Sequence, residues 1–295
     1  MTIQRGCIHD KYALMDLLGE GGFSKVYFAE SLENPDIQVA VKVIDKSESE
    51  MTQKKIELIS REIEIMAEVD HRRMVKLYEV LECDEEICLV MQLAKGGELY
   101  DRLVAEGRFG EDDAKVILFQ LLEAISELHS MGVVHRDIKP ENILFLENSE
   151  DSPIVLADFG LSDYSIDLQN QTNLSGTPAY IAPEVILETE SSSAQDLWGC
   201  GLILFIMLSG YHPFFRRDEN DTLDAVVEGN YSLRKDLSEE VQDLMSKLLC
   251  TDPSLRITAE DAVHHPWFSE VKPCSSQADY FHDFVSRWIS YVWRE

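Results

Sequence analysis

Basic residues are scarce in this sequence. Its 295 residues include 26 Lys and Arg against 55 Asp and Glu, for a formal net charge of −29 at pH 7. Such a surface repels nucleic acids and anionic membranes, so we expect neither as a partner. Residues 1–95 hold 12 basic and 19 acidic residues (net −7), which leaves 14 and 36 (net −22) for the rest. The acidic second part favours basic peptides as partners, although solubility explains many of these charges equally well.

The sequence also lacks the patterns of zinc-binding, secreted and membrane-spanning proteins. Six cysteines are scattered without a CxxC or another metal-ligand spacing, so we expect neither a zinc site nor a disulfide framework. Residues 1–6 lack the apolar core of a signal peptide, so secretion is not expected. The most apolar run, 197–208, is too short to span a bilayer and predicts a buried helix. We predict a cytoplasmic location, with the nucleus as an alternative.

Two aspartates lie in motifs that indicate phosphoryl transfer. Asp137 belongs to HRDIKPEN at 135–142, and Asp158 to DFG at 158–160. A hydroxyl that attacks a triphosphate needs one carboxylate to accept its proton and another to hold the metal that neutralises the phosphates. Asp137 fits the first role and Asp158 the second. The alternative, two acidic loop residues in an acidic chain, is disfavoured because the flanking residues complete an ordered set.

A glycine-rich turn precedes these motifs. Residues 17–28 read LLGEGGFSKVYF, and the aromatic, β-branched segment from Val26 predicts a strand after the glycines. A dinucleotide-binding GxGxxG would open a helix there, which disfavours a Rossmann fold. In the next predicted strand, 37–44, Ala40 and Lys42 share one face. A small residue beside a lysine under a glycine-rich flap suits an adenine ring that leads to its phosphates.

The segment 54–69 has the period of a helix. Its apolar stripe consists of Ile56, Ile59, Ile63 and Met66. Glu62 borders this stripe. Taken alone, Glu62 would be interpreted as a solvated glutamate; together with the motifs above, it is predicted to pair with Lys42.

The composition changes near the middle of the chain. Strands are predicted at 77–80 and 87–91, and helices follow at 98–106 and 112–129. Residues 92–97 are predicted to form a hinge between the two kinds of structure. At 295 residues, the chain suits one large domain or two lobes that share a cleft. We predict a small β-rich N-terminal lobe at 1–93, a large, mostly helical lobe at 94–271, and an aromatic helical tail at 272–295.

These motifs, in this order, resemble the eukaryotic serine/threonine protein kinases over residues 12–268. The resemblance implies a two-lobed α+β kinase fold that binds ATP and Mg²⁺ between the lobes. It implies catalytic roles for Asp137, Lys139, Asn142, Lys42 and Glu62. The implied ligands of Mg²⁺ are Asn142 and Asp158. The implied ATP-binding residues are Leu18, Gly19, Gly21, Gly22, Phe23, Ser24, Val26, Ala40, Lys42, Met91, Leu93, Glu98, Glu141, Leu144 and Asp158.

Two further segments narrow the resemblance. GGELYDR at 96–102 and HHPWF at 264–268 are similar to the calcium/calmodulin-dependent protein kinase group. Lys139 and the segment GTPAY at 176–180 are typical of serine/threonine kinases rather than tyrosine kinases. Leu161, directly after DFG, resembles members that favour serine over threonine.

The resemblance also concerns the substrate. Glu98 and Glu141 match positions at which this group and its relatives bind a basic residue before the phosphoacceptor. We therefore predict basic protein or peptide substrates, with arginine at the third position before the serine or threonine.

The resemblance implies two structural contacts and one regulatory one. Glu184, the last residue of the APE tripeptide at 182–184, is expected to form a buried pair with Arg256. Asp196 is expected to brace the loop that carries Asp137 at 135–142, called the catalytic loop here. Arg136, before the catalytic aspartate, is the residue that the family pairs with a phosphate on the activation loop. Asn173 occupies the usual threonine position. Either a flanking residue, Thr172 or Ser175, is phosphorylated by an upstream kinase, or the loop is ordered without a phosphate.

Ser24 departs from the family's third glycine, but a small residue still admits the phosphates. The tail lies outside the resemblance. Its helical-period stripe consists of Tyr280, Phe281, Phe284, Val285, Trp288, Ile289, Val292 and Trp293. Acidic residues balance its basic ones, so calmodulin binding is less favoured than packing on the large lobe or an interface. An autoinhibitory role is a further alternative.

We therefore predict a serine/threonine protein kinase that transfers the γ-phosphoryl group of MgATP to protein substrates. The alternative is a pseudokinase, a nucleotide-regulated scaffold without turnover. The complete set of catalytic residues disfavours it. A small-molecule kinase is disfavoured because residues 176–184 resemble those of protein-substrate enzymes.

Overall fold

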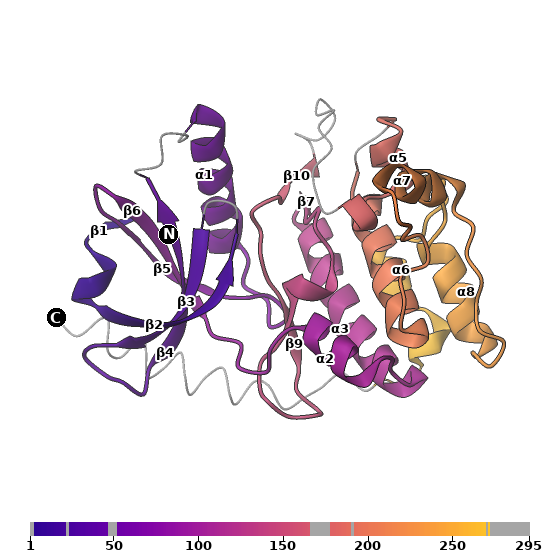
Figure 1. The fold of residues 1–295 in the computed structure, drawn as a ribbon, viewed down its shortest axis with the longest axis horizontal. Helices are drawn as coiled ribbons and strands as arrows, with labels where there is room; N and C mark the ends of the chain where they lie inside the picture. Colours follow the sequence, from indigo (N-terminus) through magenta and orange to yellow (C-terminus); the bar gives the residue numbers. More distant parts are fainter. Residues whose placement is uncertain are drawn as a thin grey trace.

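The computed structural model describes residues 3–21, 24–46, 52–165, 178–189, 192–269 and 271. Predictions made for Gly22, Phe23, residues 172–177 and the tail at 272–295 lie outside these residues. The described chain forms two parts, one built on a sheet and one built on helices, and the segment 93–98 joins them (Figure 1).

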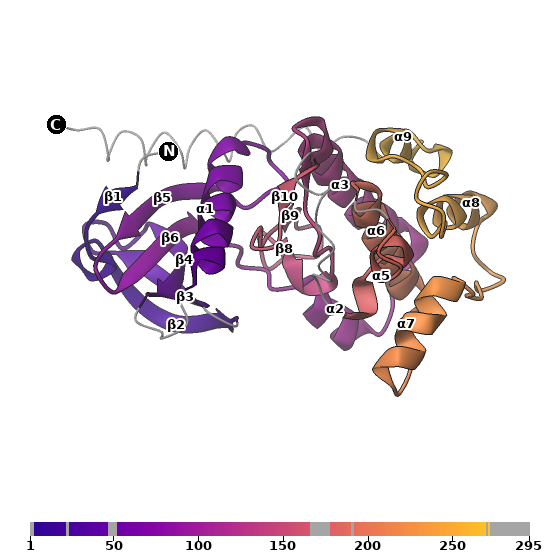
Figure 2. The same cartoon turned by 90° about the horizontal axis from the view of Figure 1, so that it is seen from above.

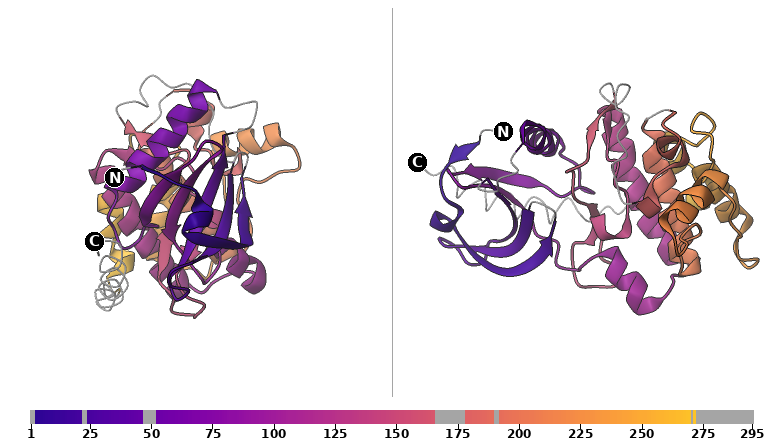
Figure 3. Two further views of the ribbon diagram at one scale, coloured as in Figure 1. Left: turned by 90° about the vertical axis from the view of Figure 1, so that its left-hand side faces the viewer. Right: turned by 45° about the horizontal axis from the view of Figure 1, so that its top comes forward.

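The first part, called the β lobe here, is a six-stranded sheet with one helix packed beside it (Figures 1 and 3). The strand order is β1-β5-β6-β4-β3-β2, with β1 parallel to β5 and every other pair antiparallel. Its elements are β1 (Gln4–Arg5), β2 (Tyr12–Glu20), β3 (Ser24–Ser31), β4 (Gln38–Asp45), α1 (Gln53–Glu68), β5 (Leu77–Glu82) and β6 (Glu86–Gln92). The strands predicted from sequence in this region are therefore confirmed.

Strand β4 has two distinct faces. Val39 and Val41 are fully buried in a small core that also contains Ile8. Ala40 and Lys42 point the other way and line the cavity between the two parts. Successive side chains of a strand alternate between faces, so the apolar alternation predicted from sequence is confirmed.

Helix α1 begins after Thr52, whose hydroxyl accepts a hydrogen bond from the backbone N–H of Lys55. Its buried residues are Glu62, Ile63, Ile65 and Met66. The predicted stripe is wrong at Ile56, which is 45% exposed. The first turn of α1 extends past the core, and the contacts of the stripe with the core begin at Ile59.

The second part, the helical lobe, is organised around one buried helix (Figure 2). Its helices are α2 (Leu99–Glu106), α3 (Glu111–Ser130), α5 (Pro183–Ile186), α6 (Ala194–Ser209), α7 (Glu219–Glu228), α8 (Glu239–Leu248) and α9 (Ala259–Val263). Nearly every residue of α6 from Asp196 to Leu208 is buried, and Trp198 stacks on Phe214 with ring centroids 5.5 Å apart. The buried helix predicted at 197–208 is confirmed.

Short strands lie where the two parts meet (Figure 2). They are β7 (Val133–Val134), β8 (Ile143–Phe145), β9 (Ile154–Leu156) and β10 (Asp163–Tyr164). β7 pairs with β10, and β8 pairs with β9. The loop with Asp137 runs from β7 to β8, and the loop with Asp158 runs from β9 to β10, so the two motifs lie at the same end of these pairs.

Within the described ranges, no helix has the length and apolar character needed to cross a membrane. The same residues contain no group of three or more His, Cys, Asp or Glu side chains arranged around a metal position. Five cysteines are described, and all are free thiols: Cys7, Cys83, Cys88, Cys200 and Cys250.

Candidate active site

The glycine-rich turn joins β2 to β3. Gly19 pairs with Val26 and Glu20 with Lys25 across this hairpin. The backbone N–H of Gly21 donates to the carbonyl oxygen of Ser24 at 2.8 Å. A strand therefore follows the glycines, as predicted, in place of the helix that a dinucleotide-binding turn requires.

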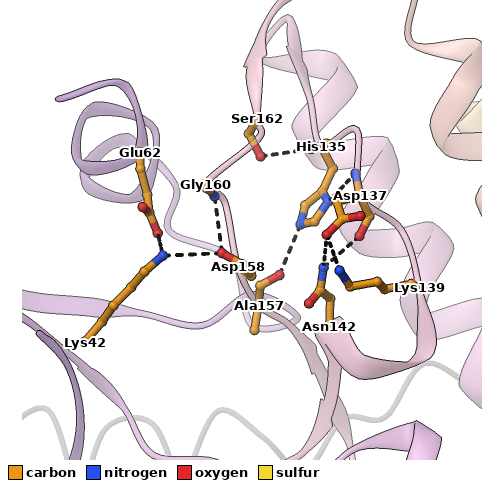
Figure 4. Close-up of polar contacts among 10 residues, drawn as sticks. All are labelled: Lys42, Glu62, His135, Asp137, Lys139, Asn142, Ala157, Asp158, Gly160 and Ser162. Atoms are coloured by element: carbon orange, nitrogen blue, oxygen red, sulfur yellow. Dashed lines mark hydrogen bonds and ion pairs between the residues drawn. The ribbon is translucent and has the colours of Figure 1, made fainter. Parts of the chain in front are cut away.

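Lys42 meets two carboxylates where the two parts of the chain face each other (Figure 4). Its Nζ lies 2.6 Å from Oε1 of Glu62 on α1 and 3.4 Å from Oδ1 of Asp158. Burial tends to lower the pKa of Lys42, but the charges of Glu62 and Asp158 outweigh it, and the pKa is raised. Lys42 is therefore a fixed ammonium group, and the predicted contact with Glu62 is present.

Asp158 has the left-handed φ of 60°, which residues other than glycine adopt rarely. Its side chain is 49% exposed and lines the cavity. Burial tends to raise its pKa, whereas Lys42 and then His135 lower it more strongly, so the pKa lies below its ordinary value. Asp158 thus presents a charged carboxylate of the kind that binds divalent cations.

Asp137 is buried and held by two neighbours in its own loop (Figure 4). Nζ of Lys139 lies 2.6 Å from its Oδ2. Nδ2 of Asn142 donates to the same oxygen at 3.0 Å and to the backbone oxygen of Asp137 at 2.8 Å. Because the amide nitrogen of Asn142 binds Asp137, its amide oxygen is the atom suited to a metal ion.

Asp196 of α6 holds the backbone of this loop. Its Oδ2 accepts the N–H of His135 at 2.9 Å, and its Oδ1 accepts the N–H of Arg136 at 2.8 Å. His129 contacts Oδ2 through Nε2 at 2.9 Å. Arg136 has a φ of 71°, and these bonds maintain a conformation that costs free energy by itself. The predicted bracing role of Asp196 is confirmed.

The predicted pair of Glu184 and Arg256 is also present, and it is buried. Nη1 and Nη2 of Arg256 lie 2.6 and 2.8 Å from the two carboxylate oxygens of Glu184. Arg256 also donates to the backbone oxygens of Cys250 and Ala194 at 2.8 Å each. The pair thereby joins α5 to the start of α6 and to the segment after α8.

These elements surround a cavity of about 380 Å³. The residues predicted from sequence that line it are Leu18, Gly19, Gly21, Ser24, Val26, Ala40, Lys42, Glu62, Met91, Leu93, Glu98, Glu141, Asn142, Leu144 and Asp158. Asp137 and Lys139 are not among its lining residues. Asp137 instead contacts one of the lining residues, because its Oδ2 accepts the hydrogen bond from Nδ2 of Asn142.

Sequence reasoning missed several lining residues: Glu20, Met66, Val75, Gln92, Ala94, Gly97, Asp101 and Ala157. Some had a local signal, because Ala157 directly precedes Asp158 and Asp101 lies one helical turn after Glu98. Val75 had none. It reaches the cavity because its N–H donates to the backbone oxygen of Leu156, a residue far away in the sequence.

One end of the cavity is acidic. It contains Glu98, Asp101 and Glu141. Burial and then the charges of Asp101 and Glu141 raise the pKa of Glu98, while Lys139 opposes the shift. Oε2 of Glu141 is buried and accepts no hydrogen bond from the described residues. This end of the cavity is therefore suited to a cationic group.

Comparison with known proteins assigns the class. The family model described as "Protein kinase domain" matches residues 12–268, so the chain belongs to the protein kinase family. The predicted two-lobed α+β kinase fold is confirmed by this match and by the arrangement of β lobe and helical lobe.

Individual relatives narrow the class. The chain is 40% identical over 266 residues to calcium/calmodulin-dependent protein kinase type 1 of Caenorhabditis briggsae, with 89% of this chain and 74% of the relative covered. The protein of the same description from Macrobrachium nipponense is 39% identical over 266 residues, with 89% and 76% covered. CBL-interacting protein kinase 5 of rice (Oryza sativa subsp. japonica) is 41% identical over 275 residues, with 92% and 58% covered. The chain is thus a serine/threonine protein kinase that resembles the calcium/calmodulin-dependent group, as predicted.

Proposed function

We propose that this kinase transfers the γ-phosphoryl group of MgATP to serine or threonine residues of basic protein substrates. The observation that supports this proposal is a single cavity that has Lys42, Asn142 and Asp158 in its wall, with Asp137 in contact with Asn142. An ammonium group, two oxygen ligands and a fixed carboxylate base are what phosphoryl transfer to a hydroxyl requires.

The composition of the cavity fits ATP and Mg²⁺. Its apolar wall, which suits a flat adenine ring, contains Leu18, Val26, Ala40, Met91 and Leu144. Asp158 and the amide oxygen of Asn142 are hard oxygen ligands of the type that Mg²⁺ prefers. Lys42, oriented by Glu62, would contact the phosphates.

We propose the following roles for the protein groups. When bound, MgATP supplies the phosphoryl group and the divalent charge that neutralises it. Asp137 orients the acceptor hydroxyl and accepts its proton, because Lys139 and Asn142 hold its carboxylate in place. Lys139, 2.6 Å from Asp137, places a positive charge beside the acceptor and stabilises negative charge on the transferred group.

Transfer can be tested with a serine peptide that carries arginine three residues before the acceptor. Wild-type protein should phosphorylate it in a Mg²⁺-dependent way, and Asp137→Asn should lower kcat by about 10²–10⁴-fold, the usual contribution of a general base. Calorimetry should detect binding of MgATP to both proteins. If the wild-type protein bound the nucleotide but transferred no phosphate, a scaffold without turnover would replace the proposed function.

The substrate preference follows from the acidic end of the cavity. Glu98 and Glu141, with the raised pKa of Glu98 and the buried Oε2 of Glu141, favour a guanidinium group that would neutralise and hydrogen-bond them. The formal net charge of −29 also favours the association of basic peptides.

A peptide array tests this preference directly. Arginine at the third position before the acceptor should be selected, and Glu98→Gln or Glu141→Gln should raise KM for that peptide about tenfold with a smaller effect on kcat. The exposed Glu106 on α2 offers a matched control, because Glu106→Gln removes the same charge farther along the helix. An array without basic selection would remove this part of the proposal.

Further partners stay predictions. For the activation loop, the sequence leaves two alternatives, an upstream kinase that acts on Thr172 or Ser175 and a loop that is ordered without a phosphate. The predicted location is the cytoplasm, with the nucleus as an alternative. Calmodulin is the partner that the sequence disfavours. Activity measured as purified, with and without calcium-loaded calmodulin, tests the last of these.

A further inference from the structure

We infer that Asp163 is a positioning residue that takes the place of an activation-loop phosphate. It holds α1 and the catalytic loop together, so that the active site is assembled without phosphorylation. This inference rests on the proposed function and concerns the regulation of the same site.

The position of Asp163 supports the inference. It lies on β10, five residues after Asp158, and its side chain is 13% exposed. Its Oδ1 lies 3.5 Å from Nε of Arg61 on α1, and its Oδ2 lies 3.9 Å from Nη1 of Arg136 in the catalytic loop. The backbone pairs with Val134 of β7, which fixes this carboxylate between two arginines from different elements.

The next residue strengthens the connection to α1. The guanidinium of Arg61 lies 4.9 Å from the ring centroid of Tyr164, and the hydroxyl of Tyr164 donates to Oε2 of Glu68 at 2.9 Å. α1 is thus held at Arg61 and again two turns later at Glu68. Glu62 follows Arg61 directly, so these contacts also determine where the partner of Lys42 lies.

Charge explains why a carboxylate is needed here. The side chain of Arg136 is largely buried. Burial lowers its pKa, and the negative charges of Asp163 and Asp196 oppose this shift. A buried guanidinium needs such compensation. Asp196 binds the backbone N–H of Arg136, whereas Asp163 faces its guanidinium and also reaches α1.

The same arginine is the one that the kinase family pairs with a loop phosphate, while the usual phosphorylated position is here Asn173. A phosphate carries about −1.5 to −2 charges at pH 7, whereas an aspartate carries about −1 at that pH and needs no kinase to install it. Asp163 is therefore a counterion for Arg136 that is weaker than a phosphate but always present in the chain.

The experiment uses the whole protein after treatment with a broad-specificity phosphatase, with complete dephosphorylation verified by intact mass. Wild type, Asp163→Asn, Asp163→Glu and the control Asp84→Asn are compared on the arginine-containing serine peptide. Asp84 lies exposed in the turn before β6 and suits the control. Dephosphorylated wild type should keep its activity, Asp163→Glu should stay within about threefold of it, and Asp84→Asn should equal it.

Asp163→Asn should lower kcat/KM for ATP about tenfold, with KM for ATP raised and KM for the peptide unchanged. The two substrates should differ because α1 positions Lys42 through Glu62, whereas the acidic end of the cavity does not depend on α1. Arg61→Gln should have a similar effect, and combining it with Asp163→Asn should add less than the product of the single effects. The Arg61→Gln variant and the double variant keep the test valid if Asp163→Asn folds poorly.

Three results would overturn the inference: wild type that needs a phosphate for activity, Asp163→Asn within twofold of wild type, or activity that falls only in proportion to the folded fraction seen by thermal melting. Absence of transfer by wild type in every phosphorylation state would instead remove the proposed function.

Discussion

Replacement of Glu184 by glutamine should destabilise the protein by about 3–5 kcal/mol. The side chains of Glu184 and Arg256 are 1% and 0% exposed, so water cannot compensate either charge. Glu184→Gln keeps the shape but leaves the guanidinium without a counterion. It also turns an amide N–H₂ group toward the N–H groups of Arg256, where two acceptor oxygens lie now.

The reciprocal change should cost at least as much. Arg256→Met leaves the carboxylate of Glu184 buried and also removes the donor to the backbone oxygens of Cys250 and Ala194. Each oxygen left without a donor costs about 1–3 kcal/mol. Because an apolar pair avoids buried charge altogether, the combination of Glu184→Leu with Arg256→Met should recover part of the loss.

Urea unfolding at pH 7 measures these free energies, and thermal melting provides a second measurement, with about 2–4 °C expected per kcal/mol. The control is Asp70→Asn, which breaks an ion pair with Lys76 of 3.1 Å whose carboxylate side chain is 77% exposed. An exposed pair of this kind contributes less than about 1 kcal/mol. If Glu184→Gln cost no more than Asp70→Asn, the reasoning from burial would be refuted.

Other expected outcomes concern pH, packing and catalysis. Burial would raise the pKa of Asp196, but its hydrogen bonds and the charges of His129 and His135 outweigh burial, so the pKa is depressed. Its contribution to the free energy of unfolding is therefore full above about pH 4 and is lost as the pH falls through the depressed pKa. The difference in unfolding free energy between wild type and Asp196→Asn should therefore shrink in acid, and a constant difference would contradict this. Gly96→Ala should cost about 1–3 kcal/mol in urea unfolding, because the new Cβ would clash with the backbone oxygen of Glu147; Gly6→Ala, with open space, should cost far less. Lys42→Met should abolish measurable transfer in the peptide assay while circular dichroism stays native, and retained activity would contradict the proposed phosphate contact.

Much of the fold was accessible from sequence because its elements have local signals. The alternation along β4 identified Lys42 as facing the cavity, since a strand has a period of two. The length and apolar character of residues 197–208 identified α6, although the same pattern gives no partner for Trp198. The error at Ile56 arose because a helical period shows which face is apolar, but not how far along the helix the core extends.

The residues that sequence reasoning missed depend on long-range contacts. Val75 enters the cavity through a bond to the segment before Asp158. Asp163 was one acidic residue among 55, and only its placement between α1 and the catalytic loop distinguishes it. Of the glycine-rich loop, Gly22 and Phe23 lie outside the described residues, so their predicted roles stay predictions.

The short strand β1 has a practical consequence. The kinase family match begins at residue 12, yet Gln4 and Arg5 already pair with β5, and Ile8 is 1% exposed in the core of the β lobe. A truncated protein that starts at residue 12 would lose these contacts and leave the end of β5, at Leu81 and Glu82, as an open sheet edge, a template for intermolecular pairing. Recombinant versions that include the first eleven residues should be the more soluble ones.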